Sequence, residues 1–307
     1  MRKLGLLFIF AAVCCLALAV GVFALKTGTP APGAPTASPA PALPLPTPTP
    51  QPTPAPTPQP TDLPAAARPG YASVGPFELD GLDAQRLPWG QGKQVNEQNQ
   101  PLGAVQYQQE YGALGGLFLA PAQPQPTVYL TFDFGYETGY SAAILDTLAE
   151  KQAPATFFVV GSYAKNNADT VRRMLAEGHT VGSHSLTHKD MTALSLEQAR
   201  AELTDFNAQF RELFGQTPQL FRFPEGVFSR QLLALAANEG MYSVFWSYAY
   251  ADWAADDQPD PAESLQKALD AAHPDAIYLL HPMATNSAIL GDLIDGLRAA
   301  GYTVAPL

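Results

Sequence analysis

The chain has 307 residues, 47% of them hydrophobic, and a formal net charge of -11 at neutral pH. This acidic balance argues against nucleic acid as a partner, because nucleic-acid binding needs a basic surface. It also argues against electrostatic docking on anionic lipid or on an anionic wall polymer. The length permits one or two domains.

The first 26 residues are typical of an export signal. Arg2 and Lys3 precede an apolar run over residues 4–25, which ends at Lys26. A basic start followed by an apolar stretch indicates a secretory signal, and roughly 20 apolar residues also suffice to span a bilayer. We therefore expect residues 1–26 to be a signal peptide or a transmembrane anchor, and we favour the uncleaved anchor. In either case the remainder is exported, and any membrane contact comes through this segment alone.

Residues 27–64 form a proline-rich segment. Between residues 29 and 64 there are 15 prolines, half of the 30 in the chain. Such a sequence cannot bury a core and favours the extended polyproline II conformation. We expect a disordered linker that carries the following domain from the membrane into the cell wall. Cys14 and Cys15 are the only cysteines and precede the linker, so the exported part has no disulfide.

Beyond residue 65, strand-like apolar runs alternate with helix-like amphipathic runs. The strand-like runs cover residues 127–132, 155–160, 180–183, 220–223, 242–247, 276–281 and 302–305. The helix-like runs cover residues 141–151, 196–214 and 286–300. This alternation, with continuous apolar strands, predicts a parallel sheet in an α/β fold. Seven strands fit either a barrel or a doubly wound open sheet.

Polar residues at the ends of four strands favour the barrel. Asp133, His184, Arg222 and His281 each stand at or just after the carboxyl end of a different strand-like run. In a (β/α) barrel these ends converge on one mouth, where catalytic residues gather. We therefore expect an α/β fold with a distorted (β/α)7 barrel, forming a single catalytic domain behind the anchor and the linker.

Two histidines have a spacing that suits metal ligands. His184 and His188, in the sequence HSLTH, are four residues apart, so one turn of helix would place both imidazoles on one face. Two such imidazoles make half of a metal site, although the same spacing also occurs on solvated helix faces. His179 and His273 look like turn residues without a functional role.

Five motifs occur in a fixed order along the second half of the chain. They are TFDFG (131–135), HSLTH (184–188), RFPEG (222–226), ADW (251–253) and LLHP (279–282). Together they resemble the polysaccharide deacetylase family, carbohydrate esterases with a NodB-type domain. Within it, the sequence is most similar to the muramic acid deacetylases that form the δ-lactam of peptidoglycan. The resemblance implies a deacetylase domain over 125–307 and extends more faintly over 85–118. We therefore expect an N-terminal extension over 65–124 that packs on the barrel.

The resemblance also implies catalytic roles in the hydrolysis of an acetamide. A carboxylate must take a proton from the attacking water, and an imidazole must protonate the leaving amine. The matching residues are Asp133 as the base and His281 as the acid. Arg222 would hold Asp133 in place, and Asp252 would either tune His281 or pair with Arg222.

The metal ligands implied by the resemblance are His184 and His188. A divalent cation, zinc or another, would polarise the carbonyl and activate the water. Most of the family has a second aspartate as third ligand where this chain has Phe134, so two protein ligands remain where a catalytic zinc normally has three. We therefore expect weak, exchangeable metal binding. We also expect the Phe134 ring to line the pocket and to pack against the acetyl or lactyl group of the substrate.

Four further residues are candidates for binding the substrate. In the RFPEG turn, which contains Pro224 and Glu225, the backbone N–H of Glu225 would donate to the oxyanion. Glu225 departs from the aromatic residue usual in the family at this position. Tyr136 and Trp253 could stack on sugar faces, although either could equally belong to the core.

These expectations point to metal-assisted N-deacetylation of peptidoglycan amino sugars, with N-acetylmuramic acid as the favoured residue. Two alternatives stay open, a deacetylase of N-acetylglucosamine polymers and a catalytically inactive wall-binding module. The presence of Asp133, Arg222, Asp252 and His281 disfavours the inactive module. We expect a monomer, anchored to the cell membrane or secreted, that acts on glycan strands at the cell wall.

Overall fold

The computed structural model describes residues 74–307. The predicted export segment (1–26), the predicted linker (27–64) and the first residues of the predicted extension lie outside the described residues. Within residues 74–307, no helix is both long enough and apolar enough to cross a membrane.

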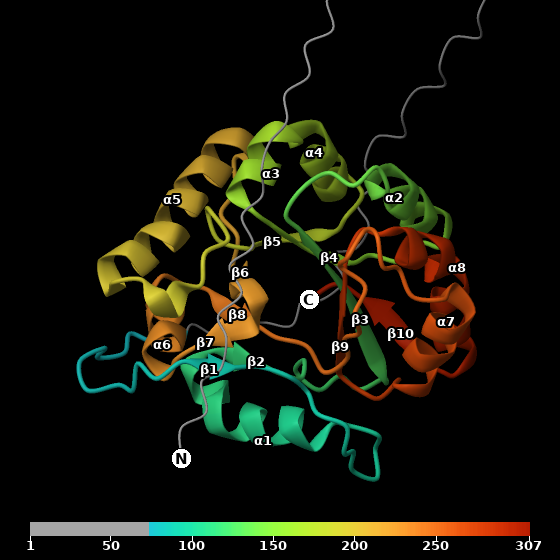
Figure 1. Ribbon diagram of the computed structural model, residues 1–307, viewed down its shortest axis with the longest axis horizontal. Helices are drawn as coiled ribbons and strands as arrows, with labels where there is room; N and C mark the ends of the chain where they lie inside the picture. Colours follow the sequence, from blue (N-terminus) through green and yellow to red (C-terminus); the bar gives the residue numbers. More distant parts are fainter. Residues whose placement is uncertain (1–73) are drawn as a thin grey trace, which may run out of the picture. The chain divides into compact units, whose positions relative to one another are not determined.

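A parallel sheet of eight strands forms the centre of the fold (Figure 1). Its strands follow the order β10-β3-β4-β5-β6-β8-β2, and β9 also pairs with β3. Their bounds are β2 (Gly116–Leu117), β3 (Thr127–Phe134), β4 (Thr156–Val159), β5 (Thr180–Ser183), β6 (Leu220–Phe221), β8 (Tyr242–Val244), β9 (Ala276–Leu280) and β10 (Thr303–Ala305). All seven strand-like runs of the sequence are therefore strands, and β2 is added from the segment that precedes them.

Strand β3 is the point where the sheet curls round on itself. Thr131 and Phe132 pair with β9 and also with β4, so these two neighbours lie on opposite edges of β3. Residues 128–129 pair with β9 and also with β10, which places β10 on the same edge as β4. The segment that follows β8 pairs with β9 through an isolated parallel bridge between Tyr248 and Tyr278. The sheet thus forms an incomplete barrel, which confirms the predicted distorted (β/α) barrel.

Side chains alternate along β3 between two environments. Leu130, Phe132 and Phe134 belong to the large core cluster between the sheet and the helices. Tyr129 belongs to the smaller cluster inside the barrel. Because successive side chains of a strand point to opposite faces, Asp133 shares the interior side with Tyr129.

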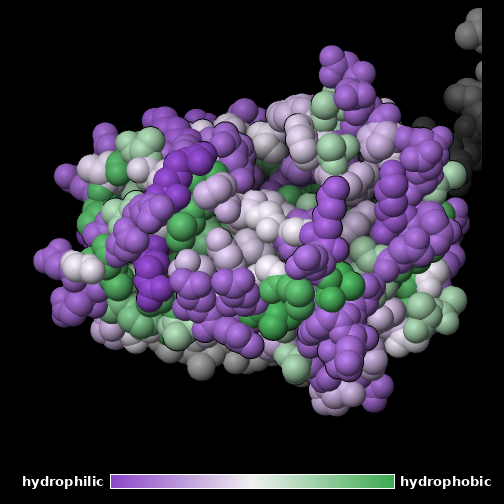
Figure 2. Space-filling view, turned by 60° about the horizontal axis from the view of Figure 1, so that its bottom comes forward, coloured by the Kyte–Doolittle hydropathy of each residue, from purple (hydrophilic) through white to green (hydrophobic). Residues whose placement is uncertain are grey.

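Helices cover the outside of the barrel (Figure 1). They are α2 (Ser141–Glu150), α3 (Gly161–Asn166), α4 (Ala168–Ala176), α5 (Leu196–Phe214), α6 (Arg230–Asn238), α7 (Pro261–Asp270) and α8 (Ala284–Ala299). The longest, α5, begins at a capping box made by Ser195 and Gln198 and ends at Gly215, whose φ is 74°. Their polar faces point outward, and hydrophilic residues predominate on the face shown in Figure 2.

The segment before the barrel packs against its rim. It contains β1 (Leu87–Pro88), α1 (Leu102–Tyr111) and the 3-10 turn Gly112–Leu114, and β1 pairs with β7 (Val227–Phe228). The Trp89 indole donates to the carbonyl of Trp246 at 3.1 Å. The Trp246 indole in turn donates to Gln91 Oε1 at 3.0 Å. This segment therefore fixes a tryptophan at the barrel mouth.

The barrel interior leaves no room for a side chain at Gly182. A Cβ atom there would lie 2.7 Å from the ring of Phe158 and 3.0 Å from the carbonyl oxygen of Leu220. We predict that Gly182→Ala lowers the free energy of unfolding by about 1–3 kcal/mol, the usual cost of overpacking, as measured by urea denaturation. Gly291→Ala is the matched control, since a Cβ there would meet Lys151 at 3.4 Å. Equal stability of the two variants would contradict the tight interior packing.

Candidate active site

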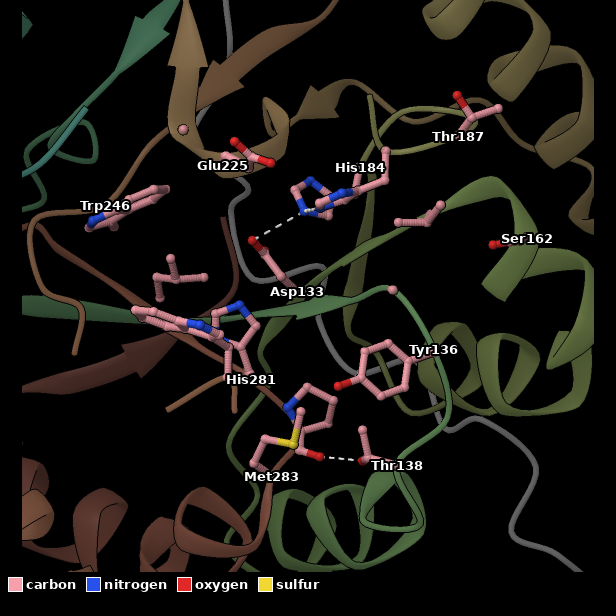
Figure 3. A pocket seen from close by; sticks show the side chains of 17 residues that line it. Asp133, Tyr136, Thr138, Ser162, His184, Thr187, Glu225, Trp246, His281 and Met283 are labelled. Carbon is pink, nitrogen blue, oxygen red and sulfur yellow. Dashed lines mark hydrogen bonds and ion pairs between the residues drawn. The ribbon is translucent and has the colours of Figure 1, made fainter. Parts of the chain in front are cut away.

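The polar residues predicted at the strand ends converge on one cavity (Figure 3). The cavity has a volume of about 830 Å³ and lies at the carboxyl ends of the strands. Seven of the predicted site residues line it: Asp133, Tyr136, His184, His188, Glu225, Trp253 and His281. The other three, Pro224, Arg222 and Asp252, are buried behind its wall.

Arg222 is buried at the bottom of the site and is held from several sides. Its side chain is 0% exposed, and its Nη1 donates to Asp133 Oδ1 at 2.7 Å. The same guanidinium donates to the carbonyls of Val244 at 3.0 Å and Phe245 at 3.3 Å, and it lies 4.2 Å above the ring of Phe158. Arg222 therefore forms a buried ion pair with Asp133 and limits the positions that this carboxylate can take.

The carboxylate of Asp133 is kept ionised. Burial alone would raise its pKa, but the charge of Arg222 lowers it. Because Oδ1 is engaged by Arg222, Oδ2 is the oxygen left to accept a proton, and it lies 3.5 Å from His184 Nε2. Asp133 thus has the protonation state that a general base needs.

Asp252 pairs with His281 and not with Arg222, which decides between the two roles predicted for it. Its Oδ1 lies 2.7 Å from His281 Nδ1, and its Oδ2 accepts the backbone N–H of His281 at 2.9 Å. Burial would lower the pKa of His281, but the hydrogen bond and charge of Asp252, with the charge of Asp133, raise it. His281 therefore retains a proton to higher pH than an ordinary imidazole.

The two histidines of HSLTH meet without a helix, so the predicted helical turn is wrong. Their Nε2 atoms lie 3.2 Å apart, but the segment is a loop after β5. Ser185 and His188 have φ values of 64° and 59°, which a right-handed helix does not contain. The loop bends because its N–H groups bond to side chains and to the neighbouring helix rather than to one another.

Glu202 of α5 ties this loop to the helix layer. Its backbone carbonyl accepts from Leu186 N at 3.1 Å. Its carboxylate, only 6% exposed, accepts from the N and Oγ1 of Thr187 at 2.8 and 2.5 Å. We did not single out Glu202 from the sequence, although it lies on the apolar stripe of α5 between Ala199 and Phe206. A charged residue on such a stripe was the signal that could have found it.

Phe134 faces the core and not the cavity. Its side chain is 0% exposed, and its ring packs edge-on against Phe157 and Tyr163 with centroids 5.3 and 5.2 Å apart. It is not one of the residues that line the cavity. The expectation that its ring lines the pocket and touches the substrate is therefore wrong. The physical reason is strand alternation, which turns Phe134 away from Asp133.

The aromatic and turn candidates lie at the cavity wall. Tyr136 and Trp253 are both 59% exposed, which excludes a core role for either ring. Glu225 is exposed and has a φ of 56° in a 3-10 turn, and the preceding Pro224 is buried. We did not predict Trp246, which also lines the cavity, because it lies within an apolar strand-like run.

His184 and His188 suit a divalent cation as a pair. A separation of 3.2 Å between their Nε2 atoms is close to that of two nitrogen ligands bound at about 2 Å to one tetrahedral cation. His184 Nδ1 lies 2.9 Å from the Arg222 carbonyl, and burial lowers the pKa of His184 to about 4, so its ring stays in the neutral form that binds metals. Within residues 74–307, no group of three or more His, Cys, Asp or Glu side chains could hold a metal.

Comparisons with known proteins place this site in a family. A family model described as polysaccharide deacetylase matches residues 120–244. The peptidoglycan-N-acetylmuramic acid deacetylase PdaA of Bacillus subtilis is 34% identical over 231 residues, which cover 75% of this chain and 87% of PdaA. The solved structure of that protein, described as a family 4 carbohydrate esterase, matches with a TM-score of 0.67 over 72% of this chain and 95% of that chain.

Two further matches show the range of the relatives. A chitooligosaccharide deacetylase of Sinorhizobium fredii is 36% identical over 157 residues, covering 51% of this chain and 72% of the relative. A pseudoenzyme of the same esterase family from Bacillus anthracis is 27% identical, with a TM-score of 0.58 over 62% of this chain and 67% of that chain. The match to PdaA extends over most of both proteins, so the chain belongs to the polysaccharide deacetylase family of hydrolases.

Proposed function

We propose that this protein removes the acetyl group from amino sugars of peptidoglycan, with N-acetylmuramic acid as the favoured residue. One observation carries the proposal: Asp133, held by Arg222, and His281, held by Asp252, line the same cavity with pKa values shifted in opposite directions. Such a pair supplies a base and an acid at one pH. The activity named for PdaA supports the choice of sugar.

The first half of the reaction uses Asp133. Its Oδ2 takes a proton from the attacking water as the water oxygen bonds to the acetamide carbon. Arg222 keeps Oδ1 engaged and the carboxylate ionised. The backbone N–H of Glu225 is proposed to donate to the oxygen on which negative charge develops, a role typical of backbone donors at such sites.

The second half uses His281. Because Nδ1 is paired with Asp252, the proton available to the substrate is on Nε2. It passes to the sugar nitrogen as the carbon–nitrogen bond breaks, which leaves acetate and a free amine. Tyr136 and Trp253, exposed at the wall, are proposed to stack on the faces of neighbouring sugars, since aromatic rings offer large apolar contact at low entropic cost.

We further propose that His184 and His188 hold a divalent cation. When bound, such a cation polarises the acetamide carbonyl and lowers the pKa of a bound water. With two protein ligands the affinity is expected to be low, because catalytic zinc sites normally have three. The separation of 3.2 Å between the Nε2 atoms of the two rings supports this assignment. The hydrogen bond from Thr187 to Glu202, which holds the loop that carries both rings, supports it as well.

The place of action is proposed to be the cell wall. The pattern of residues 1–26 supports export, through either a cleaved signal or a retained anchor, and residues 27–64 would act as the spacer. The deacetylase domain over 125–307 would act as a monomer on glycan strands, with the extension over 65–124 against it.

The test is acetate release by the full-length protein from purified peptidoglycan, with and without added divalent metal. Release from muramic residues, located by mass spectrometry of the digested glycan, supports the proposal. Release only from N-acetylglucosamine supports the alternative suggested by the chitooligosaccharide deacetylase of Sinorhizobium fredii. Binding to peptidoglycan without release under any metal would indicate an inactive wall-binding module.

Replacing the base should abolish turnover. We predict that Asp133→Asn lowers acetate release by about 10²- to 10⁴-fold, the usual contribution of general acid–base catalysis. Asp146→Asn is the matched control, because that carboxylate also pairs with an arginine, Arg173, but on the surface. Circular dichroism checks that both variants fold. More than about a tenth of wild-type activity in a folded Asp133→Asn protein would show that Asp133 is not the base.

Phe134→Asp should not create a third metal ligand. We predict unchanged zinc affinity in calorimetric titration and a loss of about 3–5 kcal/mol in unfolding free energy, because a large core side chain is replaced by a carboxylate. Phe134→Leu is the control for lost volume alone and should cost less. Tighter zinc binding by the aspartate variant would place residue 134 at the cavity after all.

Removing the hydrogen bonds between Glu202 and the histidine loop should weaken metal binding. We predict that Glu202→Ala lowers zinc affinity by about 10- to 100-fold, the usual effect of losing a group that orients metal ligands. The readout is competition with a chromogenic chelator, which does not depend on turnover. Glu212→Ala, an exposed change on the same helix, should have no effect. Equal affinities in the two folded variants would remove Glu202 from this role.

A further inference from the structure

Asn286 connects the acid side of the site to helix α8. It is 1% exposed and lies in the first turn of that helix. Its Nδ2 donates to Asp252 Oδ2 at 2.5 Å and to the backbone carbonyl of His281 at 2.9 Å. Its Oδ1 accepts the hydroxyl of Tyr250 at 2.5 Å. A buried amide with all these contacts made is tightly held.

The amide of Asn286 can take only one orientation. If it were turned over, Oδ1 would face the carboxylate of Asp252 and the carbonyl of His281, and both are acceptors. The hydroxyl of Tyr250 supplies the donor that Oδ1 requires. Burial, followed by the charge of Asp252, raises the pKa of Tyr250, so the hydroxyl keeps this proton.

We propose that Asn286 and Tyr250 are positioning residues for the proton donor, acting through Asp252. Asn286 donates to the same carboxylate oxygen that accepts the backbone N–H of His281. It thereby fixes the rotation of the carboxylate, so that the other oxygen stays on Nδ1 of the imidazole. It also supplies a hydrogen bond to a carboxylate that is 0% exposed and has no bulk water to bond instead. The inference rests on the proposed function in taking His281 as the acid.

The charged groups around His281 show why the effect passes through Asp252. Asp252 and the more distant Asp133 favour the protonated imidazole, whereas Arg222 opposes it. Of these three groups, Asp252 is the one that Asn286 contacts. Without the amide, the buried carboxylate would be free to turn away from the imidazole, and His281 would lose its hydrogen-bonded negative partner. His281 would then lose its proton at a lower pH.

The experiment compares pH profiles of acetate release by full-length variants. In Asn286→Ala the alkaline limb of kcat/KM should move to lower pH, so that the loss of activity is about tenfold greater on the alkaline side than on the acidic side. Tyr250→Phe should move it in the same direction and by less. Asn207→Ala is the matched control, a buried asparagine on α5 at 8% exposure, and it should leave the limb in place.

A second readout does not depend on turnover. The titration of the His281 ring is followed by NMR, with the signal assigned by its loss in His281→Gln. Lower pKa values in both variants support the inference, even if the wild-type protein releases no acetate and the proposed function fails. An unmoved titration in folded Asn286→Ala overturns it, and if that variant does not fold, an unmoved titration in Tyr250→Phe overturns it.

Discussion

The buried ion pair between Arg222 and Asp133 is the contact on which the site depends. Removing two charges from water is costly, and the attraction between them offsets that cost only when the geometry is good and the remaining donors are satisfied. Here the guanidinium meets Asp133 of β3 and two carbonyls at the end of β8, while its own backbone N–H bonds to Ser183 of β5. The pair therefore joins strands that are far apart in sequence. It also fixes where the base stands.

The same physics acts with opposite sign on the other side of the cavity. His281 is only partly buried, and its near neighbour is the anion Asp252 instead of a cation. One environment thus lowers the pKa of a carboxylate and the other raises the pKa of an imidazole. Charge partners decide both states against the effect of burial. The cavity between them is the place where a substrate would meet both groups at once.

Much of this arrangement could be predicted from the sequence, and each wrong or missing prediction has a local physical cause. The strands could be predicted because they are continuous apolar runs. Asp133, His184 and His281 could be predicted because they are polar residues at the ends of those runs. The prediction for Phe134 was wrong because it relied on the position of the family's third ligand. Strand β3 continues to Phe134, and the alternation of the strand turns this side chain to the core. The shape of the histidine loop depends on Glu202, a residue from the next helix, which spacing within the loop cannot reveal. Asn286 could not be singled out from the sequence either, because its partner Asp252 is distant along the chain.

The fold alone does not decide between an active enzyme and an inactive protein, since the Bacillus anthracis pseudoenzyme has a similar fold. The distinction has to come from groups that are costly to bury and that only catalysis requires. A module that merely binds glycan needs apolar walls and exposed rings such as Tyr136 and Trp253. It has no need of a fully buried arginine beneath a carboxylate, nor of a buried aspartate that raises the pKa of an imidazole. Apolar residues of similar size would stabilise such a module as well or better. The retention of both pairs in one cavity is therefore the physical argument for turnover.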